Sequence, residues 1–166
     1  NILKIKDLYK DSSTLSKLNF KVSVGNVVWN QCKSILTDDK SKTLLIYSSD
    51  IKDNKLIVQK YSNIMKKNYI DKEGIDMPTL LVNRGYGKGK YKFNYCLIEG
   101  GFKYLIENHL IHISYNGDIS KEELIEYYKK IIKSFENERT KMFIELYFKN
   151  NAINTTELEY ILPIYI

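Results

Sequence analysis

The spacing of apolar residues changes within one stretch, residues 110–135, which reads LIHISYNGDISKEELIEYYKKIIKSF. Its first part, Leu110–Tyr115, has the character of a strand, and Asn116-Gly117 after it is a pair typical of turns. Ser120 stands three residues before Glu123, which is the spacing of a capping box at the start of a helix. Apolar residues then recur every three to four positions, so the stretch predicts a strand followed by an amphipathic helix.

The chain before this stretch has the patterns of strands. Phe20, Val22 and Val24 alternate with polar residues, which predicts a strand. Gly25 interrupts that strand, as expected for a bulge or for a close approach of another backbone. The other predicted elements are strands at 43–47, 55–60, 79–83 and 91–98, a Lys-rich loop at 61–76 and a short helix at 30–36.

The chain after this stretch has the patterns of helices. A second helix is predicted at 138–149, and a capping box at Thr156–Glu159 predicts a short last helix. We expect residues 1–18 to be an N-terminal arm or linker with one helical turn after Ser13-Thr14, and residues 19–166 to be a single domain. Strands followed by helices indicate an α+β fold, with a mixed, mainly antiparallel sheet of about six strands followed by two or three helices.

The composition excludes several classes of protein. Apolar residues make up 43% of the chain, which indicates a globular rather than a disordered protein. No segment approaches the ~20 apolar residues of a membrane span, so no membrane partner is expected. Cys32 and Cys96 lie far apart without a CxxC motif, and we expect free thiols in a reducing, cytoplasmic location.

The charge is consistent with a polyanionic partner without requiring one. The net charge is +6, from 26 Lys and Arg residues against 20 Asp and Glu residues. A basic protein of this kind suits nucleic acid, but an A/T-rich genome would produce the same excess of lysine. Arg84 and Arg139 are the only arginines, so these two positions depart from the lysine bias of the chain.

The most distinctive local feature is the segment 83–92, which reads NRGYGKGKYK and lies between two predicted strands. Glycine lets a backbone approach a phosphate or a base closely. Arginine can bind a guanine edge through two hydrogen bonds, tyrosine can stack on a base, and lysine can neutralise phosphates. The candidate DNA-binding residues are Arg84, Tyr86, Lys88, Lys90 and Lys92; the alternative is a solvated Lys-rich hairpin without a ligand.

A second candidate segment is 24–31, which reads VGNVVWNQ. Asparagine and glutamine side chains can read adenine through two hydrogen bonds, so Asn26, Asn30 and Gln31 are further DNA-binding candidates. In the alternative interpretation, Trp29 belongs to the core and Asn30-Gln31 caps a helix. The sequence alone leaves both interpretations open.

Signs of catalysis are weak. His109 and His112 are three residues apart on a predicted strand and should point to opposite faces, so neither a catalytic pair nor a zinc site is expected. Asp50 and Asp53 lie near lysines, as carboxylates do in metal-dependent nucleases. One alternative function is therefore a small metal-dependent restriction nuclease subunit, and another is a protein-interaction module. No catalytic residue and no metal ligand is predicted.

Several segments resemble one family in the same order along the chain. Val22–Lys33 resembles the opening strand of the target-recognition domain of adenine-N6 DNA methyltransferases in restriction–modification systems, of the TaqI-like and Type IIG kind. Glu107–Ile113 is similar to the strand that precedes that domain's helices, and the helix with Leu124 follows as it does there. Asn154–Ile164 resembles the closing segment of a short helix and Leu-Pro-Ile.

The resemblance implies a sequence-specific module that positions double-stranded DNA for base flipping by a separate catalytic domain. In that family, S-adenosylmethionine and the Asn-Pro-Pro-Tyr-type motif belong to the N-terminal methyltransferase domain. The prolines of this chain, Pro78 and Pro163, follow Met77 and Leu162, so that motif is not in this sequence. We therefore expect no cofactor in this fragment, no methylation by it alone, and a methyltransferase domain of the same parent chain as its partner.

Overall fold

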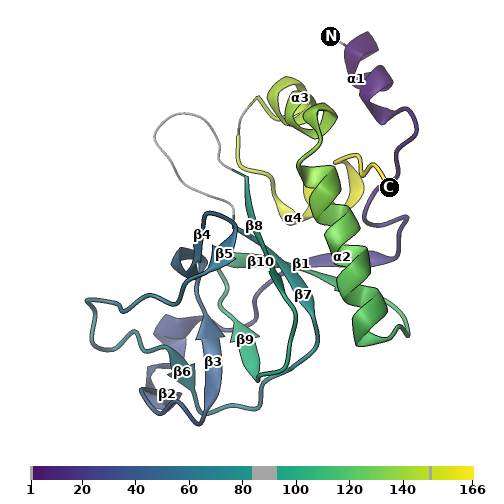
Figure 1. Ribbon diagram of the computed structural model, residues 1–166. Coiled ribbons are helices and arrows are strands. Elements are labelled where there is room, and N and C mark those ends of the chain that lie inside the picture. Colours follow the sequence, from purple (N-terminus) through teal and green to yellow (C-terminus); the bar gives the residue numbers. More distant parts are fainter. Residues whose placement is uncertain (1, 84–92, 150) are drawn as a thin grey trace. The chain divides into compact units, whose positions relative to one another are not determined.

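The computed structural model describes residues 2–83, 93–149 and 151–166, which form two compact units (Figure 1). The helical unit joins the N-terminal stretch, up to Val22, to the C-terminal stretch from Ile113. The strand unit runs from Ser23 to Asn83 and from Asn94 to His112. Within the described ranges, no helix is both long enough and apolar enough to cross a bilayer.

The described strands form two four-stranded sheets and one hairpin. The sheets have the strand orders β1-β10-β7-β8 and β2-β6-β3-β9, and β4 pairs with β5. Strand β7 is antiparallel to β8, and β6 is antiparallel to both β2 and β3, whereas β3 and β9 are parallel. The bounds are β1 (Phe20–Val24), β2 (Leu36–Thr37), β3 (Thr43–Ile46), β4 (Ile51–Lys52), β5 (Lys55–Leu56), β6 (Tyr69–Ile70), β7 (Thr79–Asn83), β8 (Asn94–Ile98), β9 (Tyr104–Ile106) and β10 (Leu110–Tyr115).

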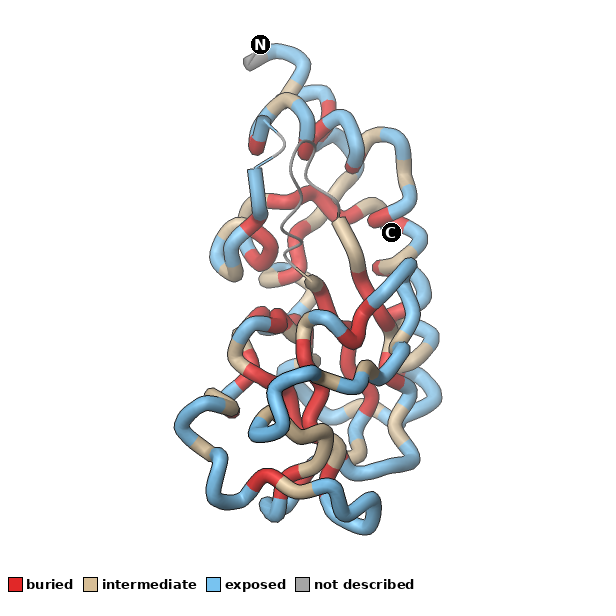
Figure 2. Tube along the Cα trace, turned by 90° about the vertical axis from the view of Figure 1, so that its left-hand side faces the viewer, coloured by how far each residue is buried: buried red, intermediate tan, exposed pale blue. Residues whose placement is uncertain are grey.

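Alternate residues of β3 and β9 lie in different apolar clusters. Ile46 packs with Tyr104 and Ile106 in one cluster, while Leu45 and Leu105 belong to the other. Successive side chains of a strand point to opposite faces, so both faces of this sheet are covered. That explains why the sequence of these strands is continuously apolar rather than alternating. Figure 2 marks the buried, intermediate and exposed residues along the Cα trace.

The helical unit is organised around the helix that the capping box predicts. Its helices are α1 (Ile2–Tyr9), α2 (Lys121–Phe135), α3 (Glu138–Tyr147) and α4 (Thr155–Tyr160). The Ser120 hydroxyl accepts a hydrogen bond from the Glu123 N–H at 3.1 Å, which caps α2. Tyr128, on the buried face of α2, donates its hydroxyl proton to the carbonyl of Ile113 at 2.7 Å. The ring of Phe20 packs edge-on against Tyr127 of α2, which joins β1 to this helix.

Arg139 holds the C-terminal end of α1. Its Nη2 donates to the carbonyl oxygens of Asp7, Leu8 and Lys10 at 3.0, 3.3 and 2.6 Å. Its guanidinium also lies over the ring of Tyr165, 4.2 Å from the ring centroid. The last carbonyls of a helix have no partner within the helix, and a cation there also interacts favourably with the helix dipole. One of the two arginines therefore has a structural role.

We expect Arg139→Ala to lower the free energy of unfolding by about 2–3 kcal/mol, because three carbonyls lose a charged donor and Tyr165 loses a cation–π contact. Urea denaturation measures the loss. Arg139→Lys should recover part of it. Lys141→Ala is the control, since its ion pair with Glu138 is exposed and its loss should change stability by less than about 0.5 kcal/mol. Equal stabilities of Arg139→Ala and Lys141→Ala would contradict the structural role.

The α+β class predicted from the sequence is confirmed. The predicted strands at 79–83 and 110–115 agree with β7 and β10, and the helical turn after Thr14 is present because the Leu18 N–H donates to the Thr14 carbonyl. The described residues contain ten strands rather than about six. The additional strands, β2, β4, β6 and β9, have only two or three residues each, too few for alternation to be visible in the sequence. Only Lys55–Leu56 of the predicted strand at 55–60 forms a ladder.

Two local predictions were wrong. Residues 30–36 form two 3-10 turns, Trp29–Gln31 and Lys33–Ile35, rather than one helix. The N-cap of α4 is Asn154 rather than Thr156, since the Asn154 side chain accepts from the Glu157 N–H at 2.8 Å. Helix α1 was not predicted; it lies within residues 1–18, and Leu8 on it is buried through contacts with α3, which is distant in sequence.

Candidate nucleic-acid interface

The segment that follows β1 is held against the backbone at the end of β9. The Val27 N–H donates to the Ile106 carbonyl at 3.3 Å, and the Asn108 N–H donates to the Val27 carbonyl at 2.8 Å. The Asn108 side chain donates to the carbonyl of Gly25 at 3.1 Å. A Cβ atom on Gly25 would lie only 2.2 Å from the Ile106 carbonyl oxygen, so only glycine permits this approach. The close approach predicted at Gly25 is confirmed.

The buried carboxylate of Glu107 fixes the start of the turn that carries Trp29. It accepts hydrogen bonds from the N–H of Trp29 at 3.4 Å and from the N–H of His109 at 3.0 Å. The ring Nδ1 of His109 lies 2.6 Å from the same carboxylate, while the rest of this side chain is exposed. Glu107 therefore positions the backbone at Trp29, and His109 is hydrogen-bonded to the same carboxylate.

Three aromatic side chains surround the ammonium group of Lys66. Its Nζ lies 5.5 Å from the ring centroid of Trp29, 4.7 Å from that of Tyr47 and 4.3 Å from that of Tyr61. We call Trp29, Tyr47 and Tyr61 the aromatic cage. The Nζ of Lys33 lies over the ring of Trp29 as well, at 5.6 Å. Each ammonium is attracted by the negative face of the ring below it.

Asp50 accepts hydrogen bonds from two residues of the aromatic cage, Tyr47 and Tyr61. Its carboxylate is fully buried and accepts from the N–H of Tyr47 at 2.9 Å, the N–H of Gln59 at 2.9 Å and the hydroxyl of Tyr61 at 2.7 Å. Burial raises the pKa of the Tyr47 hydroxyl well above its usual value, and the charges of Glu107 and Asp50 raise it further. Burial likewise raises the pKa of Tyr61. Both hydroxyls therefore stay protonated at neutral pH.

Three of the predicted DNA-binding residues are close in sequence to Trp29 of this cage: Asn30 and Gln31 directly follow it, and Asn26 precedes it by three residues. Asn26 follows Gly25 in a bend, and Asn30 and Gln31 lie in the first 3-10 turn with exposed side chains. Their amide groups make no hydrogen bond to any other described residue, and they cap no helix. Trp29 is only partly buried, so its ring is shared between the core and the surface.

The other five candidates, Arg84, Tyr86, Lys88, Lys90 and Lys92, lie outside the described residues. Sequence reasoning missed Lys33 and Lys66, the two cations that accompany Asn30 and Gln31. Neither ammonium pairs with a carboxylate among the residues that the structure describes. No sequence signal marks Lys66, because the three rings around it come from separate segments, and Trp29 is 37 residues away from it in the sequence.

Comparisons with known proteins do not assign the chain to a family. No family model matches the chain, and neither a curated protein nor a solved structure is significantly similar to it. The functional argument therefore depends on the geometry of the site and on the chemistry of its residues.

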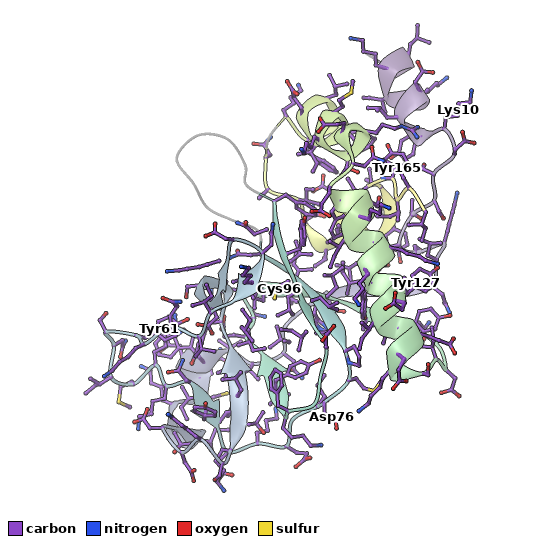
Figure 3. All side chains as sticks on the ribbon, viewed as in Figure 1. Lys10, Tyr61, Asp76, Cys96, Tyr127 and Tyr165 are labelled. Carbon is purple, nitrogen blue, oxygen red and sulfur yellow. The ribbon has the colours of Figure 1, made fainter. Side chains whose placement is uncertain are left out.

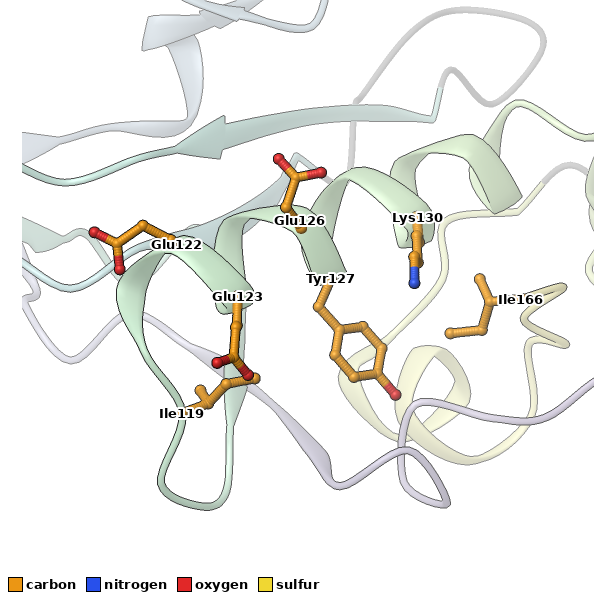
Figure 4. Close-up of a pocket in the computed structure, with 7 residues that line it drawn as sticks. All are labelled: Ile119, Glu122, Glu123, Glu126, Tyr127, Lys130 and Ile166. Carbon is orange, nitrogen blue, oxygen red and sulfur yellow. The ribbon is translucent and has the colours of Figure 1, made fainter.

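Two other hollows suit DNA less well. One lies along α2 in the helical unit, where Glu122, Glu123 and Glu126 give it a negative charge (Figure 4). The other is lined by Lys42 and Lys103 near the start of β3, but both lysines are paired with carboxylates. Phosphates would be repelled by the first hollow and would compete with an internal partner in the second.

A metal site is not apparent in the described ranges. No group of three or more His, Cys, Asp and Glu side chains that could hold a metal ion occurs there. Both oxygens of the Asp50 carboxylate already accept hydrogen bonds. Cys32 and Cys96 are free thiols, as expected, and burial raises the pKa of Cys96, which lowers its reactivity.

Proposed function

We propose that this chain is the DNA target-recognition module of an adenine-N6 DNA methyltransferase in a restriction–modification system. One observation carries the proposal: the exposed amides of Asn30 and Gln31 stand on a fixed turn beside two lysines without carboxylate partners among the described residues, Lys33 and Lys66. The turn belongs to Val22–Lys33, the segment that resembles the opening strand of that family's recognition domain.

The chemistry of these residues suits duplex DNA. Asparagine and glutamine amides match the donor and acceptor of adenine in the major groove. Lysine ammonium groups bind phosphates and thereby fix the position of the protein along the duplex. The Glu107 and Gly25 contacts hold the turn in place before DNA binds, so little conformational entropy is lost on binding.

In this proposal the chain holds the duplex while a separate N-terminal domain of the parent chain binds S-adenosylmethionine and flips the adenine. The reacting groups would all belong to that domain. The role of Asn30, Gln31, Lys33 and Lys66 is to choose the site and to orient the DNA.

We expect the chain to bind mixed-sequence 30-base-pair duplexes weakly, with an affinity that falls steeply between ~50 and ~200 mM salt. Fluorescence anisotropy at both concentrations measures it. Lys33→Ala should weaken binding to all sequences alike and reduce the salt slope by about 1, because one phosphate contact is lost. Joint replacement of Asn30 and Gln31 by alanine should keep the slope and abolish the preference among sequences selected from a random pool.

Lys129→Ala is the control, since its ammonium pairs with Glu126 on α2, far from the proposed interface in sequence. It should bind as the unmodified chain does. Affinity that is independent of salt, or no binding even at ~50 mM salt, would refute the proposal.

A further inference from the structure

The loop between β5 and β6 carries a hydrogen-bonded turn with an apolar tip. The Asn63 side chain accepts a hydrogen bond from the Met65 N–H at 3.0 Å, and the Asn63 carbonyl accepts one from the Lys66 N–H at 3.0 Å. This turn presents Ile64 with 83% of its surface exposed, more than any other large apolar residue that the structure describes. Met65 beside it is 44% exposed. We call Ile64 and Met65 the apolar tip.

Both sides of the tip are fixed to the strand unit. On one side, the Tyr61 hydroxyl donates to the buried carboxylate of Asp50. On the other, Lys66 inserts its ammonium among the three rings of the aromatic cage. The Asn68 side chain closes the base of the loop by donating to the Gln59 carbonyl at 2.8 Å. Figure 1 shows this loop extending away from β3 and β6, and Figure 3 labels Tyr61 near its base.

The surroundings of the tip are positively charged. Residues 57–69 contain Lys60, Lys66 and Lys67 and no Asp or Glu. The tip itself is only two residues wide, whereas a protein-binding surface needs a broader contiguous apolar patch. A narrow apolar tip between cations instead matches a stacked base step between phosphates, where inserted Ile or Met side chains partly unstack the bases and bend the duplex.

We propose that Ile64 is a wedge that inserts between base pairs of the bound duplex, with Met65 packing beside it. This inference rests on the proposed function and deepens it. Lys66 connects the two parts of the site, since its ammonium lies over Trp29 while its own backbone belongs to the turn that presents Ile64. The amides of Asn30 and Gln31 read base edges, and the wedge deforms the same duplex.

The test is relaxation of a closed circular plasmid by topoisomerase I in the presence of the full 166-residue chain. Insertion between base pairs untwists DNA and leaves a change in linking number after the protein is removed. At equal occupancy, measured by anisotropy, Ile64→Ser should reduce that change by at least about twofold, and Ile64→Met should retain it. Leu3→Ser is the matched control, because Leu3 is 79% exposed on α1.

The outcomes separate the two proposals. A chain that binds DNA but leaves the linking number unchanged would overturn the wedge and leave the recognition module standing. Equal changes with Ile64→Ser and with the unmodified chain would do the same. A chain that does not bind the plasmid at low salt would overturn both proposals. A change reduced by Ile64→Ser, but not by Ile64→Met or Leu3→Ser, supports the wedge.

Discussion

Replacing Gly25 by alanine should lower the free energy of unfolding by about 3 kcal/mol or more, one of the two largest effects we expect. A Cβ there would lie 2.2 Å from the carbonyl oxygen of Ile106 and 2.3 Å from that of Glu107. Both obstacles are backbone atoms, so no side-chain rotation relieves the contact. The segments must separate, and the bond from Val27 to Ile106 is lost with them. Urea denaturation followed by circular dichroism measures the change.

Gly101→Ala is the control for this prediction. A Cβ on Gly101 would meet no described atom within 4 Å, although the φ of +86° at this residue disfavours alanine. Its replacement should therefore cost only the backbone strain, about 1–2 kcal/mol. Gly25→Ala should also weaken DNA binding even where the chain stays folded, because Asn30 and Gln31 move with the displaced segment. A Gly25→Ala variant no less stable than Gly101→Ala would show that the approach to Ile106 is not tight.

Local patterns were enough to predict a large part of the fold. The cap at Ser120 and the spacing of Leu124, Tyr128 and Ile131 predict α2 because both signals lie within one helix. Gly25 predicts a close approach because an interior glycine is unfavourable in a strand without such a reason. These features depend on residues that are close together in the sequence, so a sequence pattern is enough to predict them.

The remaining features depend on contacts between distant segments. Helix α1 has no predicted cap, and Arg139, about 130 residues away, satisfies its last carbonyls. The aromatic cage joins Trp29, Tyr47 and Tyr61 from three separate segments. No periodicity or motif connects these positions, so the cage is visible only in three dimensions.

The candidate site was predicted only in part for the same reason. Asn26, Asn30 and Gln31 were candidates on side-chain chemistry alone, and the structure adds that they are exposed and that their side-chain amides have no hydrogen-bond partner among the described residues. It also adds the neighbouring cations, Lys33 and Lys66, which a Lys-rich sequence cannot distinguish from its other lysines. Position relative to Trp29, rather than residue type, makes these two lysines distinctive.

The second large effect is expected for Asp50→Ala, which should lower the free energy of unfolding by about 3–5 kcal/mol. Asp50 is fully buried, and its removal leaves three donors without their acceptor: the N–H groups of Tyr47 and Gln59 and the hydroxyl of Tyr61. A buried donor without a partner costs about 1–3 kcal/mol, and water entering the space offsets part of the sum. Thermal and urea denaturation measure the loss.

Matched variants distinguish this structural role from the metal-binding role that a nuclease would require. Asp50→Asn keeps one acceptor oxygen and should lose less stability than Asp50→Ala, while Asp38→Ala, at an exposed position, should change stability by less than about 0.5 kcal/mol. Mg²⁺ should leave the melting temperature of the unmodified chain unchanged, because both Asp50 oxygens already accept hydrogen bonds. Asp50→Ala with unchanged stability, together with loss of a Mg²⁺-dependent nicking activity, would instead favour the nuclease. The hydrogen bonds of Asp50 predict the opposite: a folding defect, and a carboxylate that serves Tyr61 and the loop carrying Ile64.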